Sequence, residues 1–228
     1  MEIVKDIHCI KLLFNRAFLL AGKRLILIDT GHPYQAKRII RFIRAMGRKP
    51  EELSLIILTH HHIDHRGSAR VLKRITGAKI AAHTDDIPFI EGEKHSYIGY
   101  RLWWIRFLLF LTELIFQKEQ VTVDIELHDN NKIEGLVVYH TPGHTGGSIS
   151  LLLKSKKVLF CGDTVPYTLA KLKRPNPSTI NHKEEFMSIK KLSELDFAIL
   201  LPNDCRMVLS DGVSVLKRFC HKELGIRN

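Results

Sequence analysis

Thr59-His60-His61-His62-Ile63-Asp64-His65 is the stretch of sequence that decides how this chain folds and what it does. It follows Leu53–Leu58, an almost wholly apolar run that predicts a short buried strand. It precedes Arg66–Thr76, in which apolar residues recur at helical spacing. The sequence therefore predicts that the histidines lie on a loop between a core strand and a helix.

The loop carries four side chains that bind metal ions well. A strand-to-helix loop can fold back so that His60 and His62 point at one ion while Asp64 and His65 point at a neighbouring ion. A continuous helix with this spacing could not produce that arrangement. His61 would point away. The alternative is a solvated histidine-rich turn, but the preceding core strand and further candidate ligands downstream favour a metal site.

Two later strand ends each carry one more candidate ligand. Val137–Tyr139 is an apolar run that leads into a turn containing His144, and Val158–Phe160 leads into Asp163. Gly143 beside His144 allows the backbone to turn tightly and approach its neighbours closely. The carboxylate of Asp163 has two oxygens and can bridge two ions.

Four motifs occur in a fixed order along the chain. They are Ile28-Asp29-Thr30-Gly31, His-x-His-x-Asp-His at 60–65, Thr-Pro-Gly-His-Thr-Gly-Gly-Ser at 141–148 and Gly-Asp-Thr at 162–164. In this combination the chain resembles the metallo-β-lactamase superfamily, and its glyoxalase II-like and lactonase-like hydrolases in particular. The resemblance spans roughly 25–204. It implies an α/β fold, a four-layer αβ/βα sandwich of two mixed sheets flanked by helices.

The resemblance also implies a set of metal ligands. The first metal would be held by His60, His62 and His144, the second by Asp64 and His65, and Asp163 would bridge the two. The family usually completes the second site with a histidine after a late strand. Here the predicted strand Phe197–Leu201 runs into Asp204 instead.

Asp204 bears on which metal binds. A carboxylate in place of an imidazole makes the second site rich in oxygen, which favours manganese or iron(II) over zinc more than imidazole ligands do. The expectation is one or two zinc ions, with a second site that is weaker or holds manganese or iron. In the alternative, Asp204 is only a turn or capping residue and the second site stays empty.

The implied chemistry is hydrolysis by a metal-bound hydroxide, since a metal ion lowers the pKa of bound water from about 15.7 to about 7. Asp64 and Asp163 would be the catalytic carboxylates, and the substrate would be an ester, lactone or thioester. Tyr167 would contact the substrate, since the lactone-hydrolysing branch has a tyrosine close to this place; in the alternative it is an ordinary packed loop tyrosine. Three alternatives stay open: a mononuclear iron enzyme of the sulfur-dioxygenase type, a nuclease, and a metal-binding relative without turnover. His62 favours hydrolysis, because the iron flavoproteins of the family tend to carry glutamate there.

Length, composition and charge predict the number of domains, the location and the class of partner. A chain of 228 residues with 45% hydrophobic content predicts one domain, residues 1–228. The first residues lack a signal-peptide pattern and predict a cytoplasmic protein. The net charge of +11 is typical of proteins that bind nucleic acid. However, the basic residues are dispersed without interleaved aromatic residues, which favours a small-molecule substrate.

An apolar segment interrupts the motifs. A helical insertion is predicted at about 93–120, and it contains Trp103 and Trp104. Its apolar run is too short for a bilayer, which needs about 20 residues. Three interpretations stay open: a helix packed in the core or in a homodimer interface, a lid that brings both tryptophans to the substrate, or a contact with a membrane surface.

The remaining elements are predicted from apolar periodicity. Strands are expected at Ile7–Leu13, Ala17–Ala21, Leu25–Asp29, Lys79–His83 and Val121–Leu127, and helices at Tyr34–Met46, Lys183–Leu195 and Val213–Leu224. The first three strands should form the outer, antiparallel part of one sheet.

Overall fold

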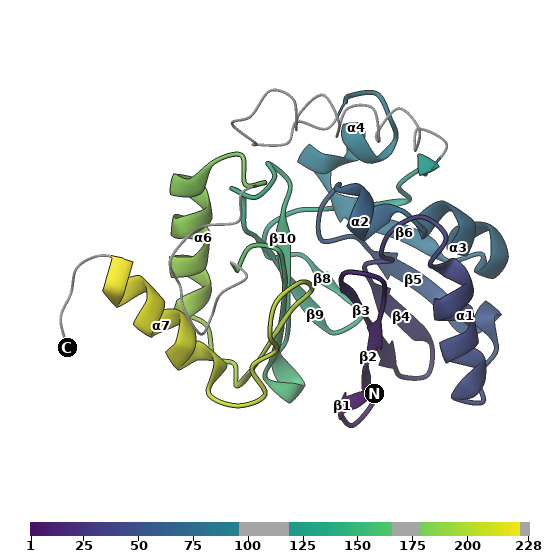
Figure 1. The fold of residues 1–228 in the computed structure, drawn as a ribbon, viewed down its shortest axis with the longest axis horizontal. Coiled ribbons are helices and arrows are strands. Elements are labelled where there is room, and N and C mark those ends of the chain that lie inside the picture. Colours follow the sequence, from purple (N-terminus) through teal and green to yellow (C-terminus); the bar gives the residue numbers. More distant parts are fainter. Residues whose placement is uncertain (96–118, 166–177, 224–228) are drawn as a thin grey trace. The chain divides into compact units, whose positions relative to one another are not determined.

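The computed structural model of this chain describes residues 1–95, 119–165 and 178–223. The described residues form two compact units, which we call the N-terminal unit (residues 1–95 and 119–127) and the C-terminal unit (residues 128–165 and 178–223). Each unit has its own sheet and its own helices (Figure 1). Most of the predicted insertion, with Trp103 and Trp104, lies outside the described residues, as does Tyr167.

The N-terminal unit contains a seven-stranded sheet in the order β1-β2-β3-β4-β5-β6-β7. Its strands are β1 (Glu2–Val4), β2 (Ile7–Lys11), β3 (Arg16–Ala21), β4 (Leu25–Ile28), β5 (Leu53–Ile57), β6 (Lys79–His83) and β7 (Ile125–Leu127). Strands β1 to β4 pair antiparallel and strands β4 to β7 pair parallel. The predicted antiparallel beginning at the outer part of the sheet is confirmed.

Helices cover this sheet because they present apolar faces to it. Helix α1 (Ala36–Ala45) buries Ile39 and Ile43, and helix α3 (Ala69–Thr76) buries Leu72. These side chains join one core with residues of β4 and β5. Figure 1 shows both helices beside these strands. Short helical turns complete the unit: η1 (Pro50–Glu52), α2 (Ile63–Arg66), η2 (Thr84–Asp86) and α4 (Ile87–Ile90).

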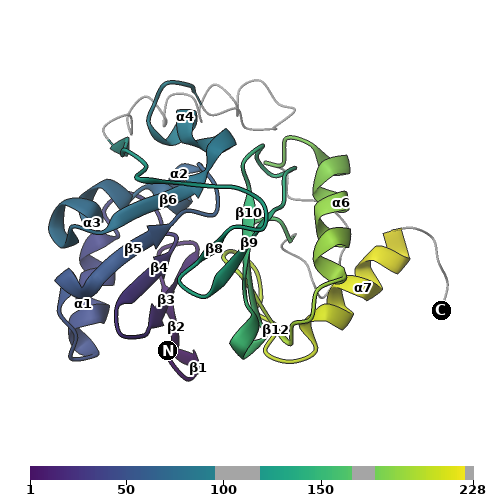
Figure 2. The same cartoon turned by 180° about the vertical axis from the view of Figure 1, so that it is seen from behind.

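The C-terminal unit contains a five-stranded sheet in the order β12-β11-β10-β9-β8. Its strands are β8 (Lys132–Ile133), β9 (Leu136–His140), β10 (Ile149–Leu153), β11 (Val158–Gly162) and β12 (Ile199–Pro202), with a short turn η4 (Lys154–Lys156). Helices α6 (His182–Ser193) and α7 (Gly212–Glu223) lie side by side along it (Figure 2). Leu192 and Leu216 from these helices share a core with Leu159 and Leu200 of the sheet.

The sheet topology brings certain strand ends together. Strands β4 and β5 are parallel neighbours, so Asp29 and the histidine-rich loop begin at the same edge of the first sheet. Strands β11 and β12 are also parallel neighbours, which places Asp163 and Asp204 at one edge of the second sheet. Strand β9 runs in the same direction as β11, because both pair antiparallel with β10, and it delivers the turn of His144 to that edge.

Three local expectations differ from the structure. Strand β10 was not predicted, and β7 begins only at Ile125 although a strand was expected from Val121. The helix expected at Arg66–Thr76 is divided at Gly67, where a Cβ atom would overlap Pro33 and the carbonyl oxygen of Ile63. Glycine at position 67 therefore allows Pro33 to approach the chain closely between α2 and α3. Among the described residues, no helix is long and apolar enough to cross a membrane.

Candidate metal centre

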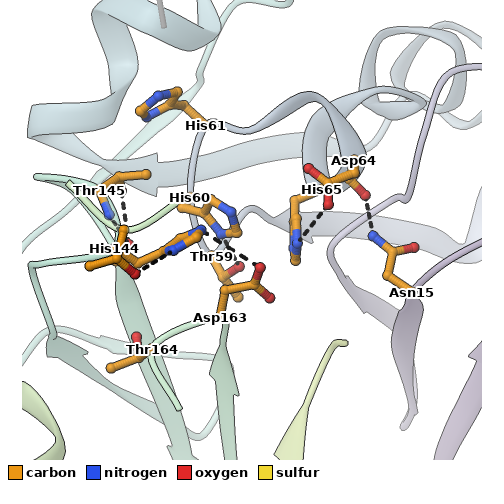
Figure 3. Close-up of polar contacts among 12 residues, drawn as sticks. Asn15, Thr59, His60, His61, Asp64, His65, His144, Thr145, Asp163 and Thr164 are labelled. Atoms are coloured by element: carbon orange, nitrogen blue, oxygen red, sulfur yellow. Dashed lines mark hydrogen bonds and ion pairs between the residues drawn. The ribbon is translucent and has the colours of Figure 1, made fainter. Parts of the chain in front are cut away.

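The N-terminal unit places four predicted ligands around the loop after β5 and the turn α2. We call His60, His62, Asp64 and His65 the first ligand group, of which Figure 3 labels His60, Asp64 and His65. The ring centroids of His60 and His62 lie 4.8 Å apart, and their ligand nitrogens fall within 4.8 Å of each other. The Nε2 atom of His65 lies 3.6 Å from an Asp64 carboxylate oxygen. These contacts show that the four side chains lie close to one another at this loop.

A buried carboxylate behind this group sets the orientation of His65. Asp29 is completely buried at the end of β4. It accepts hydrogen bonds from the backbone N–H and the hydroxyl of Thr59, both at 2.8 Å, and from Nδ1 of His65 at 2.9 Å. A neutral imidazole that donates through Nδ1 carries its lone pair on Nε2. Asp29 therefore leaves Nε2 as the nitrogen of His65 that is able to bind a metal ion.

The same carboxylate reaches His60 through Thr59. Because the Thr59 hydroxyl gives its proton to Asp29, its oxygen is available to accept from Nδ1 of His60, 3.1 Å away. This carboxylate–threonine–histidine chain leaves the lone pair of His60 on Nε2 as well. One buried aspartate thus determines the tautomers of two of the predicted ligands.

His61 turns to a different partner. Its backbone N–H donates to Asp86 at 2.8 Å, and its Nδ1 lies 3.0 Å from the other oxygen of that carboxylate. Its ring stacks on Phe89 with centroids 4.4 Å apart. Arg66 donates to the His61 carbonyl at 2.8 Å. These contacts attach His61, in the middle of the loop, to η2 and α4. They thereby fix the backbone from which the neighbouring residues His60 and His62 project.

The structure adds two neighbours that sequence reasoning missed. The side-chain amide of Asn15 donates to the backbone carbonyl of Asp64 (Figure 3). Burial lowers the pKa of His32, while the nearby negative charge of Asp64 raises it. Asn15 lies in a loop without a motif, whereas His32 directly follows the motif Ile28-Asp29-Thr30-Gly31, which was the one signal that could have indicated it. Only the pairing of distant strands brings them to Asp64.

The C-terminal unit gathers the other three predicted ligands, His144, Asp163 and Asp204, which we call the second ligand group. Nε2 of His144 lies 3.6 Å from a carboxylate oxygen of Asp163 (Figure 3). Ligand oxygens of Asp163 and Asp204 fall within 4.8 Å of each other. His144 and Asp163 are buried, whereas Asp204 is half-buried. The neighbouring thiol of Cys161 is fully buried, and burial raises its pKa well above the usual value, which suits a packing role.

The turn that carries His144 rests on the beginning of α6. Gly143 adopts φ +130°, and its carbonyl accepts from Ile180 and Asn181 at 3.1 and 2.9 Å. A Cβ atom at Gly143 would overlap the backbone of Glu185. This conformation and this close approach both require glycine.

Replacing Gly143 with alanine should therefore destabilise the protein and displace His144. We expect a loss of roughly 2–4 kcal/mol in unfolding free energy, from strain at positive φ and from overpacking against α6. Denaturant unfolding measures it. Gly146→Ala is the matched control, because a Cβ there meets nothing within 4 Å. Equal stability of the two variants would contradict this account of the turn.

A buried carboxyl group lies behind His144. Glu185 of α6 is 2% exposed and accepts the hydroxyl of Thr179 at 2.6 Å. The Thr179 oxygen lies 3.4 Å from Nδ1 of His144. The pKa of Glu185 is raised to about 7, because burial raises it more than the hydrogen bond from Thr179 lowers it, and the charge of Asp163 adds to the rise.

This raised pKa predicts a pH-dependent stability in the metal-free protein. The folded state holds the Glu185 proton more tightly than the unfolded chain, whose ordinary pKa is 4.5. The unfolding free energy should therefore fall by roughly 1–3 kcal/mol as pH rises from about 4.5 to about 7. Denaturant unfolding across this pH range should show that the unfolding free energy of Glu185→Gln changes less with pH than that of the wild type. The exposed neighbour variant Glu184→Gln should keep the wild-type slope, and identical slopes for all three proteins would refute the prediction.

The donor chemistry of both groups fits divalent metal ions. Two ligands at about 2.0–2.2 Å from one tetrahedral ion lie about 3.3–3.6 Å apart. The His65–Asp64 and His144–Asp163 atom pairs are each separated by 3.6 Å. Imidazole nitrogens and carboxylate oxygens are the ligands that zinc, iron and manganese take in proteins.

Comparison with known proteins places the chain in a family. The sequence pattern of the metallo-β-lactamase superfamily matches residues 11–205. A probable metallo-hydrolase of Methanocaldococcus jannaschii is 26% identical over 151 residues, which are 66% of this chain and 67% of that protein. A hydroxyacylglutathione hydrolase of Pseudomonas aeruginosa is 32% identical over 150 residues, 63% of this chain and 43% of that enzyme. This chain thus spans less than half the length of the second relative.

Solved structures agree on the fold. A metallo-β-lactamase family protein of Thermus thermophilus superposes with a TM-score of 0.75 at 18% identity, covering 98% of this chain and 81% of that chain. With the two mixed sheets and their helices, this confirms the predicted α/β sandwich class. The family match and the metallo-hydrolase relatives support the predicted enzyme class, a hydrolase on this fold. The chain belongs to the metallo-β-lactamase superfamily.

Proposed function

We propose that this protein is a metal-dependent hydrolase of esters, lactones or thioesters, and that the two ligand groups hold its metal. The observation that supports this most is the donor set: two pairs of ligand atoms stand at the separation that a shared ion imposes. A bound divalent ion supplies water with a pKa near 7 and polarises a carbonyl oxygen.

The proposed assignment follows the family motifs. His60, His62 and His144 hold the first ion, Asp64 and His65 hold the second with Asp204, and Asp163 serves both. Asp163 and Asp64 are the proposed catalytic carboxylates. The Asp64 side chain is 31% exposed, whereas the side chain of His65 is fully buried. Asp64 therefore reaches solvent, which suits a carboxylate that orients the attacking water and carries a proton to the leaving group.

The proposed substrate class rests on one relative and on the apolar insertion. One relative is named a hydroxyacylglutathione hydrolase, a thioesterase by that name. The apolar insertion with Trp103 and Trp104, together with Tyr167, is proposed to bind an apolar acyl part. Truncating both tryptophan side chains should change substrate preference. Loss of a dimer or of vesicle binding with unchanged preference would favour an interface or a membrane contact instead. A cytoplasmic location stays a prediction.

The native metal follows from Asp204. We propose zinc in the first site and a weaker second site whose carboxylates favour manganese or iron(II). Elemental analysis of metal-replete, dialysed protein tests this. One firmly held zinc per chain supports it, and two tightly held zinc ions contradict the weak second site.

The reaction is tested with a panel of thioesters, lactones and esters of increasing acyl length, assayed with zinc, manganese or iron(II). Oxygen consumption with a persulfide substrate is measured in parallel. Metal-dependent hydrolysis supports the proposal. Oxygen consumption alone would point to the sulfur-dioxygenase chemistry, salt-sensitive cleavage of nucleic acid to a nuclease, and no turnover with any metal to a binding protein.

A further inference from the structure

The histidine of the second ligand group has a hydrogen-bonded chain behind it within the C-terminal unit. The hydroxyl of Thr179 lies 2.6 Å from Glu185 Oε1 and 3.4 Å from His144 Nδ1. All three side chains are buried. They come from the turn after β9, the segment before α6 and the first turns of α6. Proximity along the chain alone does not explain their convergence.

The length of the first bond indicates which way its proton points. An O–H donor to a carboxylate typically lies about 2.5–2.7 Å from its acceptor, shorter than a bond between neutral groups. At 2.6 Å, Thr179 donates to Glu185. Its oxygen then offers a lone pair toward Nδ1 of His144, which must carry the proton.

The C-terminal unit thus repeats an arrangement of the N-terminal unit. There, Asp29, Thr59 and His60 form a chain of the same residue classes, with separations of 2.8 and 3.1 Å. The two carboxylates come from unrelated elements, the end of strand β4 and helix α6. In both chains a threonine hydroxyl lies between a buried carboxylate and a histidine and connects the two by hydrogen bonds.

We propose that Glu185 is a positioning residue that acts through Thr179 to hold the proton of His144 on Nδ1 and so present Nε2 to the metal. This inference rests on the proposed function of His144 as a ligand. Packing alone would be served better by an apolar or amide side chain at position 185, because burying a carboxylate is costly unless hydrogen bonds compensate it. Asn181 caps α6 through its side chain, and its carbonyl accepts the Glu185 N–H at 3.0 Å, which fixes the helix that carries the carboxylate.

The metal-free protein gives a direct test. Nitrogen NMR of the imidazole at pH 8.5 should show His144 in the tautomer protonated at Nδ1. Thr179→Val, which keeps the side-chain shape and removes the hydroxyl, should give a mixture of tautomers. Thr179→Ser should restore the wild-type signal. A single Nδ1-protonated tautomer in the valine variant would overturn the proposal.

Metal affinity gives the second test, with zinc titrated against a chromophoric chelator. Thr179→Val should weaken zinc binding about 10–100-fold, as other changes behind a metal-binding histidine do. Thr179→Ser should stay within about threefold of wild type. Glu185→Gln should weaken it by a smaller factor, because an amide oxygen still accepts from Thr179. Adding Glu185→Gln to Thr179→Val should cause no further loss if Glu185 acts through Thr179.

The outcomes separate this inference from the proposed function. If His144→Ala binds zinc as wild type does, His144 is not a ligand and the metal assignment fails. If His144→Ala loses zinc while Thr179→Val and Glu185→Gln bind it normally, the assignment stands and the positioning role is refuted. Additive losses in the double variant would also refute it. Should Thr179→Val fail to fold by circular dichroism, Glu185→Gln and Thr179→Ser still decide the question.

Discussion

His60→Ala is expected to lower zinc affinity by more than about 100-fold and to reduce hydrolysis to the background rate. Removing a metal ligand should weaken zinc binding by more than the roughly 10–100-fold loss that follows from removing a residue that only hydrogen-bonds to a ligand. His60 is buried, and its Nδ1 is already held by Thr59, so its Nε2 is the atom that the metal would lose. Chelator competition measures the affinity, and the hydrolysis panel measures the rate.

The control for this variant is another histidine. His128→Ala removes an exposed imidazole from the C-terminal unit and should leave zinc affinity and thermal stability unchanged. If His60→Ala retains stoichiometric zinc at the affinity of the His128→Ala protein, the first metal site does not involve this loop.

Asp29→Ala is expected to cause the largest loss of stability. Removing this carboxylate leaves the N–H of Thr59, the hydroxyl of Thr59 and Nδ1 of His65 without their buried acceptor. Each buried donor that loses its partner costs about 1–3 kcal/mol, so the loss of the acceptor for all three should cost at least about 3 kcal/mol. Zinc affinity should fall as well, by about 10–100-fold, because both His60 and His65 lose the group that orients them. Denaturant unfolding and chelator competition measure the two effects.

Two further variants sharpen this prediction. Asp29 adopts φ +59°, a conformation that asparagine tolerates, so Asp29→Asn removes the charge with little backbone strain. Asp29→Asn should lose less unfolding free energy than Asp29→Ala and should still bind zinc more weakly than the wild type. Asp196→Ala breaks only the exposed ion pair with Lys157 and should cost less than about 1 kcal/mol. A similar stability loss for Asp29→Ala and Asp196→Ala would contradict the proposed role of Asp29.

The elements of the fold could be predicted from local patterns. Apolar runs predicted β5, β9 and β11, and helical periodicity predicted α1, α6 and α7. The predicted ends lie within about two residues of the observed ends. Strand β10 was not predicted, although Ile149–Leu153 is largely apolar. The close approach of Pro33 to Gly67 could not be predicted, because Pro33 comes from another loop.

The sequence by itself determined the family and the ligand types, because metal chemistry restricts the usable residues and the motifs stand where apolar strands end. Strands that run in the same direction carry such ends to one edge of a sheet, as β4 and β5 do in the N-terminal unit and β9, β11 and β12 do in the C-terminal unit. Only the tertiary structure decides which ring nitrogen His60, His65 and His144 present. That choice depends on a proton shared with Asp29, Thr59, Thr179 or Glu185, and the periodicity of a sequence carries no information about hydrogen bonds between residues that folding brings together.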